Sequence, residues 1–185
     1  SRVRFMDRAT VLLGFPHVHY LMLPWQTGLY SQADWQSFAQ AMFSQQAGLD
    51  PERWHVQVAN NLFGQQHLAV ATPRDLLQDL RDVFKLQRLP LITCTPLLTA
   101  VAQQYWRHLP DDCVLAVPEA ESLSCLYRQH GVIDQVCVIP TPPGSALSDN
   151  LFTADVLVER HAPTTLVVAN TPTEHRLGPV HPWLE

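Results

Sequence analysis

The stretch from Asp112 to Pro140 constrains the fold of this chain more than any other part of the sequence. It holds three apolar or alternating runs, and two short turns separate them, at 118–121 and 129–131. Runs of this kind, cut by turn residues, are typical of an antiparallel meander. The sequence therefore predicts three consecutive strands, at 113–117, 122–128 and 132–139.

Helix and strand patterns alternate along the rest of the chain. Apolar residues recur with a helical period in four stretches, which predicts amphipathic helices near 31–47, 74–86, 95–108 and 148–160. Alternating or short apolar runs predict strands at 18–23, 54–58, 67–71, 89–94 and 165–169, with weaker patterns at 1–8 and 10–13. Because Gly14, Phe15 and Pro16 form a turn signal, an N-terminal hairpin or meander is expected. The order predicts a mixed α/β chain.

The predicted helices carry recognisable residues at their ends. Ser31 is expected to cap the first helix, with Asp34 in its first turn and Gly48 at its end. The pairs Thr72-Pro73 and Thr95-Pro96 are expected to open the next two helices by a threonine cap and a proline at the first helical position. In the second helix, one apolar stripe is predicted to be buried: Leu76, Leu77, Leu80, Val83 and Phe84.

Composition excludes several classes of protein. The net charge of −5 over 185 residues argues against a nucleic-acid binder, which needs a basic surface to release counterions. No segment approaches the roughly 20 apolar residues that a membrane-spanning helix needs, and no signal peptide is recognised. The four cysteines sit in or beside apolar runs and are expected to be buried free thiols, a Cys125–Cys137 disulfide being the alternative.

Metal-binding and nucleophilic chemistry find little support. His17 and His19 share one face of a strand and could join His55 or His67 in a zinc site, but no cysteine or carboxylate lies at ligand spacing. The serines lack the G-x-S-x-G context of a hydrolase. Cys94 precedes a helix start, which can lower a thiol pKa, yet a buried structural cysteine is the favoured interpretation.

Two acidic pairs, Asp111-Asp112 and Glu119 with Glu121, could serve acid–base or metal chemistry, but solvated turns are the favoured interpretation. The sequence thus predicts no catalytic, cofactor-binding or metal-binding residue. Three aromatic residues flank a loop that is expected to be exposed: Phe15, Trp25 and Tyr30. Core packing is the default for each, and a protein-binding patch is the alternative, because such residues often anchor interfaces.

The succession of meander, helix and strand occurs near 3–58 and again at 112–169. With several local features, it resembles the ribonuclease H-like lobes of actin-like ATPases, and within them the PilM-like and GspL-like scaffold proteins of pilus assembly and type II secretion. The local features are Leu23-Pro24-Trp25, Asp34-Trp35, the run 54–58 leading to Gly64 and 67–71, the run 89–92, Thr95-Pro96-Leu97 and Gly131. The resemblance covers about residues 10–170.

The first turn of the meander departs from the ATPase pattern. Small residues let backbone amides approach a phosphate, whereas this turn carries Pro118, Glu119 and Glu121. Proline removes an N–H donor, and the two glutamates place negative charge where phosphates would lie. The resemblance therefore implies that the turn is a degenerate nucleotide site and that the protein is not an enzyme.

The resemblance implies two small packed subdomains, an actin-like one at 1–95 and a partial ribonuclease H-like one at 96–170, with a flexible tail at 171–185. It implies a non-catalytic scaffold without a cofactor, at the cytoplasmic face of a bacterial inner membrane. The implied partners are a membrane-anchored assembly protein and a secretion ATPase, and a homodimer is left open. An active actin-like ATP-binding protein is the alternative, and a small α/β hydrolase is a more remote one.

Overall fold

The computed structural model describes residues 8–59, 64–159 and 166–168. The chain forms two compact units, Ser1–Leu97 and Leu98–Glu185, and each is described by itself. The residues 1–7 of the first predicted strand and the predicted tail at 171–185 lie outside the described residues. The assignment of 1–95 and 96–170 as actin-like subdomains stays a prediction.

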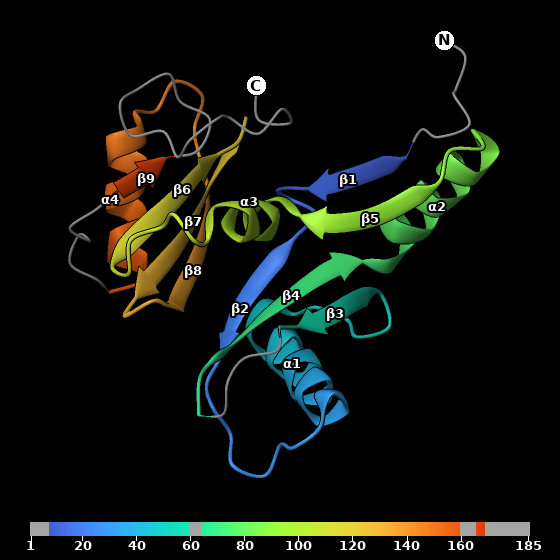
Figure 1. Ribbon diagram of the computed structural model, residues 1–185, viewed down its shortest axis with the longest axis horizontal. Helices are drawn as coiled ribbons and strands as arrows, with labels where there is room; N and C mark the ends of the chain where they lie inside the picture. The colour runs from blue at the N-terminus through green and yellow to red at the C-terminus, as the bar shows by residue number, and fades with distance from the viewer. Residues whose placement is uncertain (1–7, 60–63, 160–165, 169–185) are drawn as a thin grey trace. The chain divides into compact units, whose positions relative to one another are not determined.

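Unit 1 contains two small sheets (Figure 1). Its described elements are β1 (Ala9–Leu13), β2 (His19–Leu23), α1 (Gln32–Ala47), β3 (Trp54–Val58), β4 (His67–Pro73), α2 (Arg74–Leu86) and β5 (Leu91–Pro96). Strands β2, β4 and β3 form an antiparallel sheet with β4 in the centre. Strands β1 and β5 pair in parallel as a second sheet. The predicted helices and the strand at 54–58 are confirmed.

The predicted N-terminal hairpin or meander is wrong. Strand β1 pairs with β5, about 80 residues further along the chain, while β2 pairs with β4. The turn signal at 14–16 changes the direction of the chain but leads β2 into a different sheet. Local turn residues report that a strand ends, whereas the choice of its partner depends on which apolar faces can be buried together.

Helix α1 begins and ends as the sequence predicts. The Ser31 side chain accepts a hydrogen bond from the Asp34 N–H at 3.1 Å, and the Asp34 carboxylate accepts one from the Ser31 N–H at 3.0 Å. This reciprocal pair satisfies two of the donors that a helix start leaves open. Gly48 ends the helix in the left-handed region, at φ 64°. The buried stripe consists of Trp35, Ala39 and Phe43.

Helices α2 and α3 do not begin with threonine caps, so that prediction is wrong. Strand β4 runs through Pro73 and strand β5 through Pro96, and each helix begins at the next residue. Pro73 is the N-cap of α2, with extended backbone angles and no side-chain acceptor. The apolar stripe of α2 is less buried than predicted. No residue of this helix is fully buried, and Val83 is 54% exposed.

Unit 2 is built on the predicted meander, which is confirmed. Its described elements are α3 (Leu97–Tyr105, of which Leu97 belongs to unit 1), β6 (Cys113–Pro118), β7 (Ser122–Gln129), β8 (Val132–Pro140), α4 (Leu147–Leu157) and β9 (Leu166–Val168). The sheet order is β8-β7-β6-β9. The first three strands are antiparallel, and β9 returns after α4 to lie parallel to β6.

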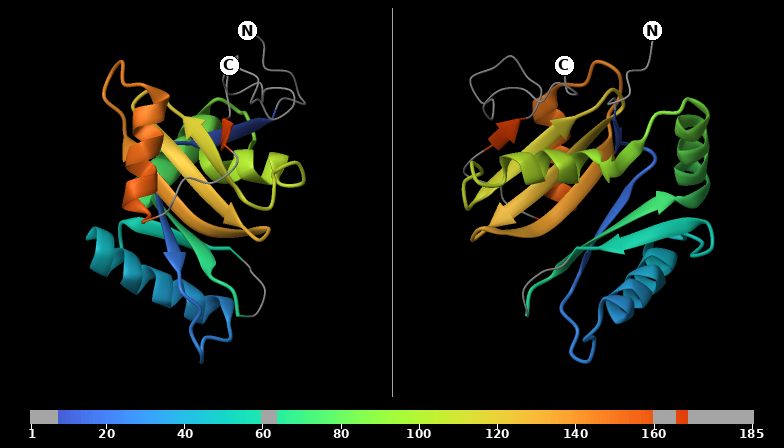
Figure 2. Two further views of the ribbon diagram at one scale, coloured as in Figure 1. Left: turned by 90° about the vertical axis from the view of Figure 1, so that its left-hand side faces the viewer. Right: turned by 45° about the vertical axis from the view of Figure 1, so that its right-hand side comes forward.

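One face of this sheet packs against α4 (Figure 2). Alternate residues of the strands face the helix, including Leu123, Cys125 and Tyr127 of β7. The Tyr127 hydroxyl donates a hydrogen bond of 2.8 Å to the carboxylate of Asp155 on α4. Burial and this hydrogen bond raise the pKa of Tyr127. The helix is therefore held by apolar packing and by one directed polar contact.

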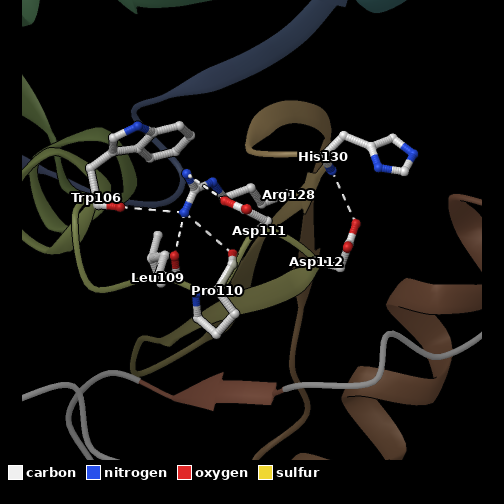
Figure 3. Close-up of polar contacts among 7 residues, drawn as sticks. All are labelled: Trp106, Leu109, Pro110, Asp111, Asp112, Arg128 and His130. Atoms are coloured by element: carbon white, nitrogen blue, oxygen red, sulfur yellow. Dashed lines mark hydrogen bonds and ion pairs between the residues drawn. The ribbon is translucent and has the colours of Figure 1, made fainter.

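Arg128 connects the end of α3 to the meander (Figure 3). One nitrogen of its guanidinium donates to the carbonyl oxygens of Trp106, Leu109 and Pro110. The other pairs with Asp111 at 3.4 Å, and the group lies 4.4 Å from the centre of the Trp106 ring. The Arg128 side chain is only 10% exposed. It supplies donors to carbonyls that follow the helix and would otherwise lack partners.

The neighbouring acidic residues hold the second turn of the meander. The Asp112 carboxylate accepts a hydrogen bond from the His130 N–H, and the Asp111 carbonyl accepts one from the Gly131 N–H. His130 and Gly131 both have positive φ, at 50° and 80°, as the two central residues of a type I′ hairpin turn require. A Cβ at Gly131 would lie 3.2 Å from the Asp111 carboxylate, so glycine is also needed for space.

We expect Arg128→Lys to destabilise the protein by about 2 kcal/mol, because an ammonium group cannot reproduce the contacts with three carbonyls, a carboxylate and a ring. The measurement is chemical denaturation followed by circular dichroism and by the fluorescence of tryptophan. Arg107→Lys is the matched control, since Arg107 is exposed nearby in the sequence. Equal stability of the two variants would contradict the role assigned to Arg128.

Candidate functional site

A pocket of about 210 Å³ opens in unit 1 between its two sheets and α2. Strands β3, β4 and β5 and helix α2 supply the lining residues. Helix α2 contacts both β4 and β5, and Figure 1 shows where these four elements lie. The lining residues are His55, Gln57, Thr72, Leu77, Arg81, Leu91, Ile92, Thr93, Cys94 and Pro96. The lining of the pocket therefore combines apolar side chains with hydroxyl, amide, imidazole and guanidinium groups.

The two-residue period of β3 places its polar side chains in this pocket. Trp54, Val56 and Val58 belong to the core under α1, so the residues between them, His55 and Gln57, face the opposite side of the sheet. Thr72 lies directly across from His55 on β4 and lines the same wall. The sheet thus has one face for the core and one for the pocket.

Arg81 is the only lysine or arginine that lines the pocket. Within the described residues, neither the Arg81 guanidinium nor the His55 imidazole makes a hydrogen bond or an ion pair. Burial lowers the pKa of His55, and the positive charges of Arg74 and Arg81 lower it further. At neutral pH the pocket therefore holds one unpaired cation beside a neutral imidazole that can donate or accept a hydrogen bond.

Cys94 also lines the pocket, but it does not have the character of a nucleophile. Burial raises the pKa of its thiol, and the charge of Arg81 offsets only part of that effect. The protonated thiol is the unreactive form. All four cysteines are free, including Cys125 and Cys137, which lie directly opposite each other on β7 and β8. Burial raises the pKa of Cys125 to about 12.

The three aromatic residues predicted as a binding patch do not line the pocket. Tyr30 is 85% exposed in the loop before α1, and Phe15 is 39% exposed between β1 and β2. Trp25 is half-buried against the core, where its ring stacks on His67 at 6.1 Å and lies 5.6 Å from Trp35. Their role in binding stays a prediction.

The suggested zinc ligands are likewise placed by packing. His19 lies edge-on to Trp54, with 4.9 Å between ring centres. His67 is buried, stacks on Trp35 at 4.0 Å and contacts the Ala59 carbonyl through Nδ1. Among residues 8–59, 64–159 and 166–168, no three His, Cys, Asp or Glu side chains are grouped as a metal site would require.

The turn between β6 and β7 is closed by its own residues. The Glu119 N–H donates to the Ser122 carbonyl at 2.8 Å, and the Ser124 hydroxyl donates to the Glu119 carboxylate at 3.1 Å. Pro118, the last residue of β6, has no N–H. The turn therefore contains the Glu119 carboxylate, and the Glu119 amide is already used in a hydrogen bond within the turn.

Sequence reasoning missed the pocket itself. It gave Arg81 no role and considered His55 only as a zinc ligand. The alternation of His55 and Gln57 along β3 is a usable signal for a second sheet face, but Arg81 and Cys94 come from other segments. Only the tertiary structure brings these groups together.

We expect the pKa of His55 to lie below 6.5, and Arg81→Gln to raise it towards that value by removing a nearby positive charge. As the pH falls, His55 is protonated in the unfolded chain at a higher pH than in the folded protein. This histidine therefore lowers the stability of the protein as the pH falls below about 6.5. NMR titration of the imidazole measures the pKa directly. Lys85→Gln, four residues further along α2, should leave it unchanged, and an equal response to both variants would contradict the geometry.

Comparisons with known proteins identify the fold. No protein-family model matches the sequence, and no curated protein sequence matches it. Among the described residues, no helix has both the length and the apolar character needed to cross a bilayer. Solved structures do match, at low sequence identity.

The chain superposes on the cytoplasmic domain of EpsL, an inner-membrane component of the type II secretion system of Vibrio cholerae, with a TM-score of 0.62 and 14% identity. The match covers 96% of this chain and 70% of that domain. A protein of unknown function with an actin-like ATPase fold, from Bacteroides thetaiotaomicron, matches with a TM-score of 0.57 and 11% identity, over 90% of this chain and 61% of its own.

A third match is a chain of the PilM-PilN type IV pilus biogenesis complex, with a TM-score of 0.53 and 13% identity. It covers 74% of this chain and 43% of the matched one. Together with the sheet order β8-β7-β6-β9, in which a meander is followed by a parallel strand, these matches show that the chain has the mixed α/β, ribonuclease H-like fold of actin-like ATPases.

Proposed function

We propose that this protein is a non-catalytic scaffold of a bacterial type II secretion or type IV pilus assembly machine. The observation that carries the proposal is the match of 96% of the chain to the EpsL cytoplasmic domain, which supports the GspL-like and PilM-like resemblance. The protein would act at the cytoplasmic face of the inner membrane. Its work would be the binding of a membrane-anchored assembly protein and a secretion ATPase.

The β6–β7 turn supports a role without nucleotide hydrolysis. A phosphate-binding turn presents backbone amides and avoids negative charge. Here the Glu119 carboxylate, held by Ser124, lies in the turn, and the Glu119 amide is already bonded to Ser122. A phosphate would have to displace these bonds and approach a like charge.

The pocket of unit 1 supports partner binding. A surface that keeps an unpaired guanidinium beside hydroxyl and amide groups is suited to a carboxylate, which Arg81 can bind in bidentate fashion. Leu77, Leu91 and Ile92 add apolar contact around it. We therefore assign to this pocket a segment of the assembly protein that presents an acidic side chain or a terminal carboxylate among apolar residues.

The test is calorimetric titration with a synthetic peptide that carries the cytoplasmic segment of the membrane-anchored assembly protein. We expect Arg81→Glu to weaken binding at least tenfold, because the substitution places like charges together in a site that desolvates them. Lys85→Glu makes the same charge change on the same helix outside the pocket and should have little effect. Equal weakening by both variants, or by neither, would contradict the assignment.

An active actin-like ATP-binding protein is the second candidate, because a protein with an actin-like ATPase fold is among the structural matches. Titration with a fluorescent ATP analogue and Mg²⁺ separates the two. The scaffold proposal expects no saturable binding below about 1 mM. Micromolar affinity that Glu119→Arg alters would establish a working nucleotide site and overturn the scaffold proposal.

A further inference from the structure

Strand β8 is an edge strand of unusual character. It is nine residues long, and among the described strands it pairs only with β7. Asp134 is the single charged residue within it, and Pro140 at its end is the single proline. Edge strands of monomeric proteins are usually protected by charge, proline, shortness or a covering element, because open N–H and C=O groups recruit other strands.

The edge strand β3 of unit 1 shows how this chain protects such an edge. The side chains of Gln32 and Gln36 on α1 donate to the carbonyls of Val58 and Val56, each at 2.9 Å. These glutamines cover β3 from the helix that packs on it. Strand β8 instead carries an apolar run from Val136 to Ile139, and none of the described strands pairs with its outer edge.

We propose that β8 pairs with β8 of a second copy of this chain, in antiparallel orientation about a two-fold axis at Val136. The proposal stands independently of the proposed function. A two-fold axis perpendicular to the sheet places a residue opposite itself, and antiparallel partners lie on the same sheet face. Centred on Val136, the pairing aligns all nine residues and extends the four-stranded sheet across the axis.

Charge and overlap favour this register over one centred on Asp134. Centred on Val136, Asp134 lies opposite Val138 of the second copy, and Ile133 lies opposite Ile139. Centred on Asp134, the two carboxylates would face each other across the axis and only five residues would overlap. Like charges directly opposite destabilise a strand pair. A second copy is therefore a well-matched occupant of this edge.

The experiment is sedimentation velocity of the full chain between about 1 and about 200 µM, since dimer formation follows mass action. We expect a concentration-dependent dimer. Val136→Lys should weaken it at least tenfold, because the two lysines meet at the axis. Val138→Lys is the matched control: it lies on the same strand and sheet face, but opposite Asp134, and should retain the dimer.

A second pair of variants keeps the test independent of simple destabilisation. Val136→Lys and Val136→Asp should each be largely monomeric alone, while an equimolar mixture should recover the dimer, because the opposite charges then meet. Circular dichroism reports whether each variant is folded. A wild type that stays monomeric to about 200 µM, a dimer equally sensitive at positions 136 and 138, or a mixture that remains monomeric would each overturn the proposal.

Discussion

Both units depend on the alternation of side chains along each strand, which gives every sheet two different faces. In β3, alternate residues pack under α1 while His55 and Gln57 line a pocket. In β7, Leu123, Cys125 and Tyr127 face α4, while the next residue, Arg128, binds carbonyl oxygens that follow α3. A shift of one residue in the register of β3 would exchange its two faces and bury His55 and Gln57 in the core. The same period thus produces both the packing and the candidate site.

Polar groups in unit 2 are used mainly to fix the chain. Arg128 donates hydrogen bonds to carbonyl oxygens that follow α3. The residues Asp111 and Asp112 hold the β7–β8 turn, and Glu119 closes the β6–β7 turn. Each buried polar atom that gains a partner avoids a desolvation cost of about 1–3 kcal/mol. Asp111, Asp112 and Glu119, three of the four acidic residues that the sequence offered as catalytic candidates, are engaged in these contacts. Unit 1 differs, because its pocket keeps Arg81 and His55 unpaired within the described residues.

The capping predictions show where local reasoning succeeds and fails. Ser31 and Asp34 act within four residues of each other, so their reciprocal bonds follow from the sequence alone. The Thr-Pro pairs have the same local chemistry, yet β4 and β5 continue through the prolines. Thr72 is held in the strand by pairing with His55 on β3. A contact between distant segments therefore outweighs the intrinsic preference of the pair for a helix start.

The sequence by itself determined the meander, the four helices and the strands at 54–58 and 67–71, because the periods of apolar residues and the turn residues are local signals. It also indicated the fold class that the structural matches bear out. Only the tertiary structure decided that β1 joins β5, that Trp25 packs on His67, and that Arg81, His55 and Cys94 share a pocket. These outcomes depend on contacts between segments far apart in the chain, and no local period specifies such contacts.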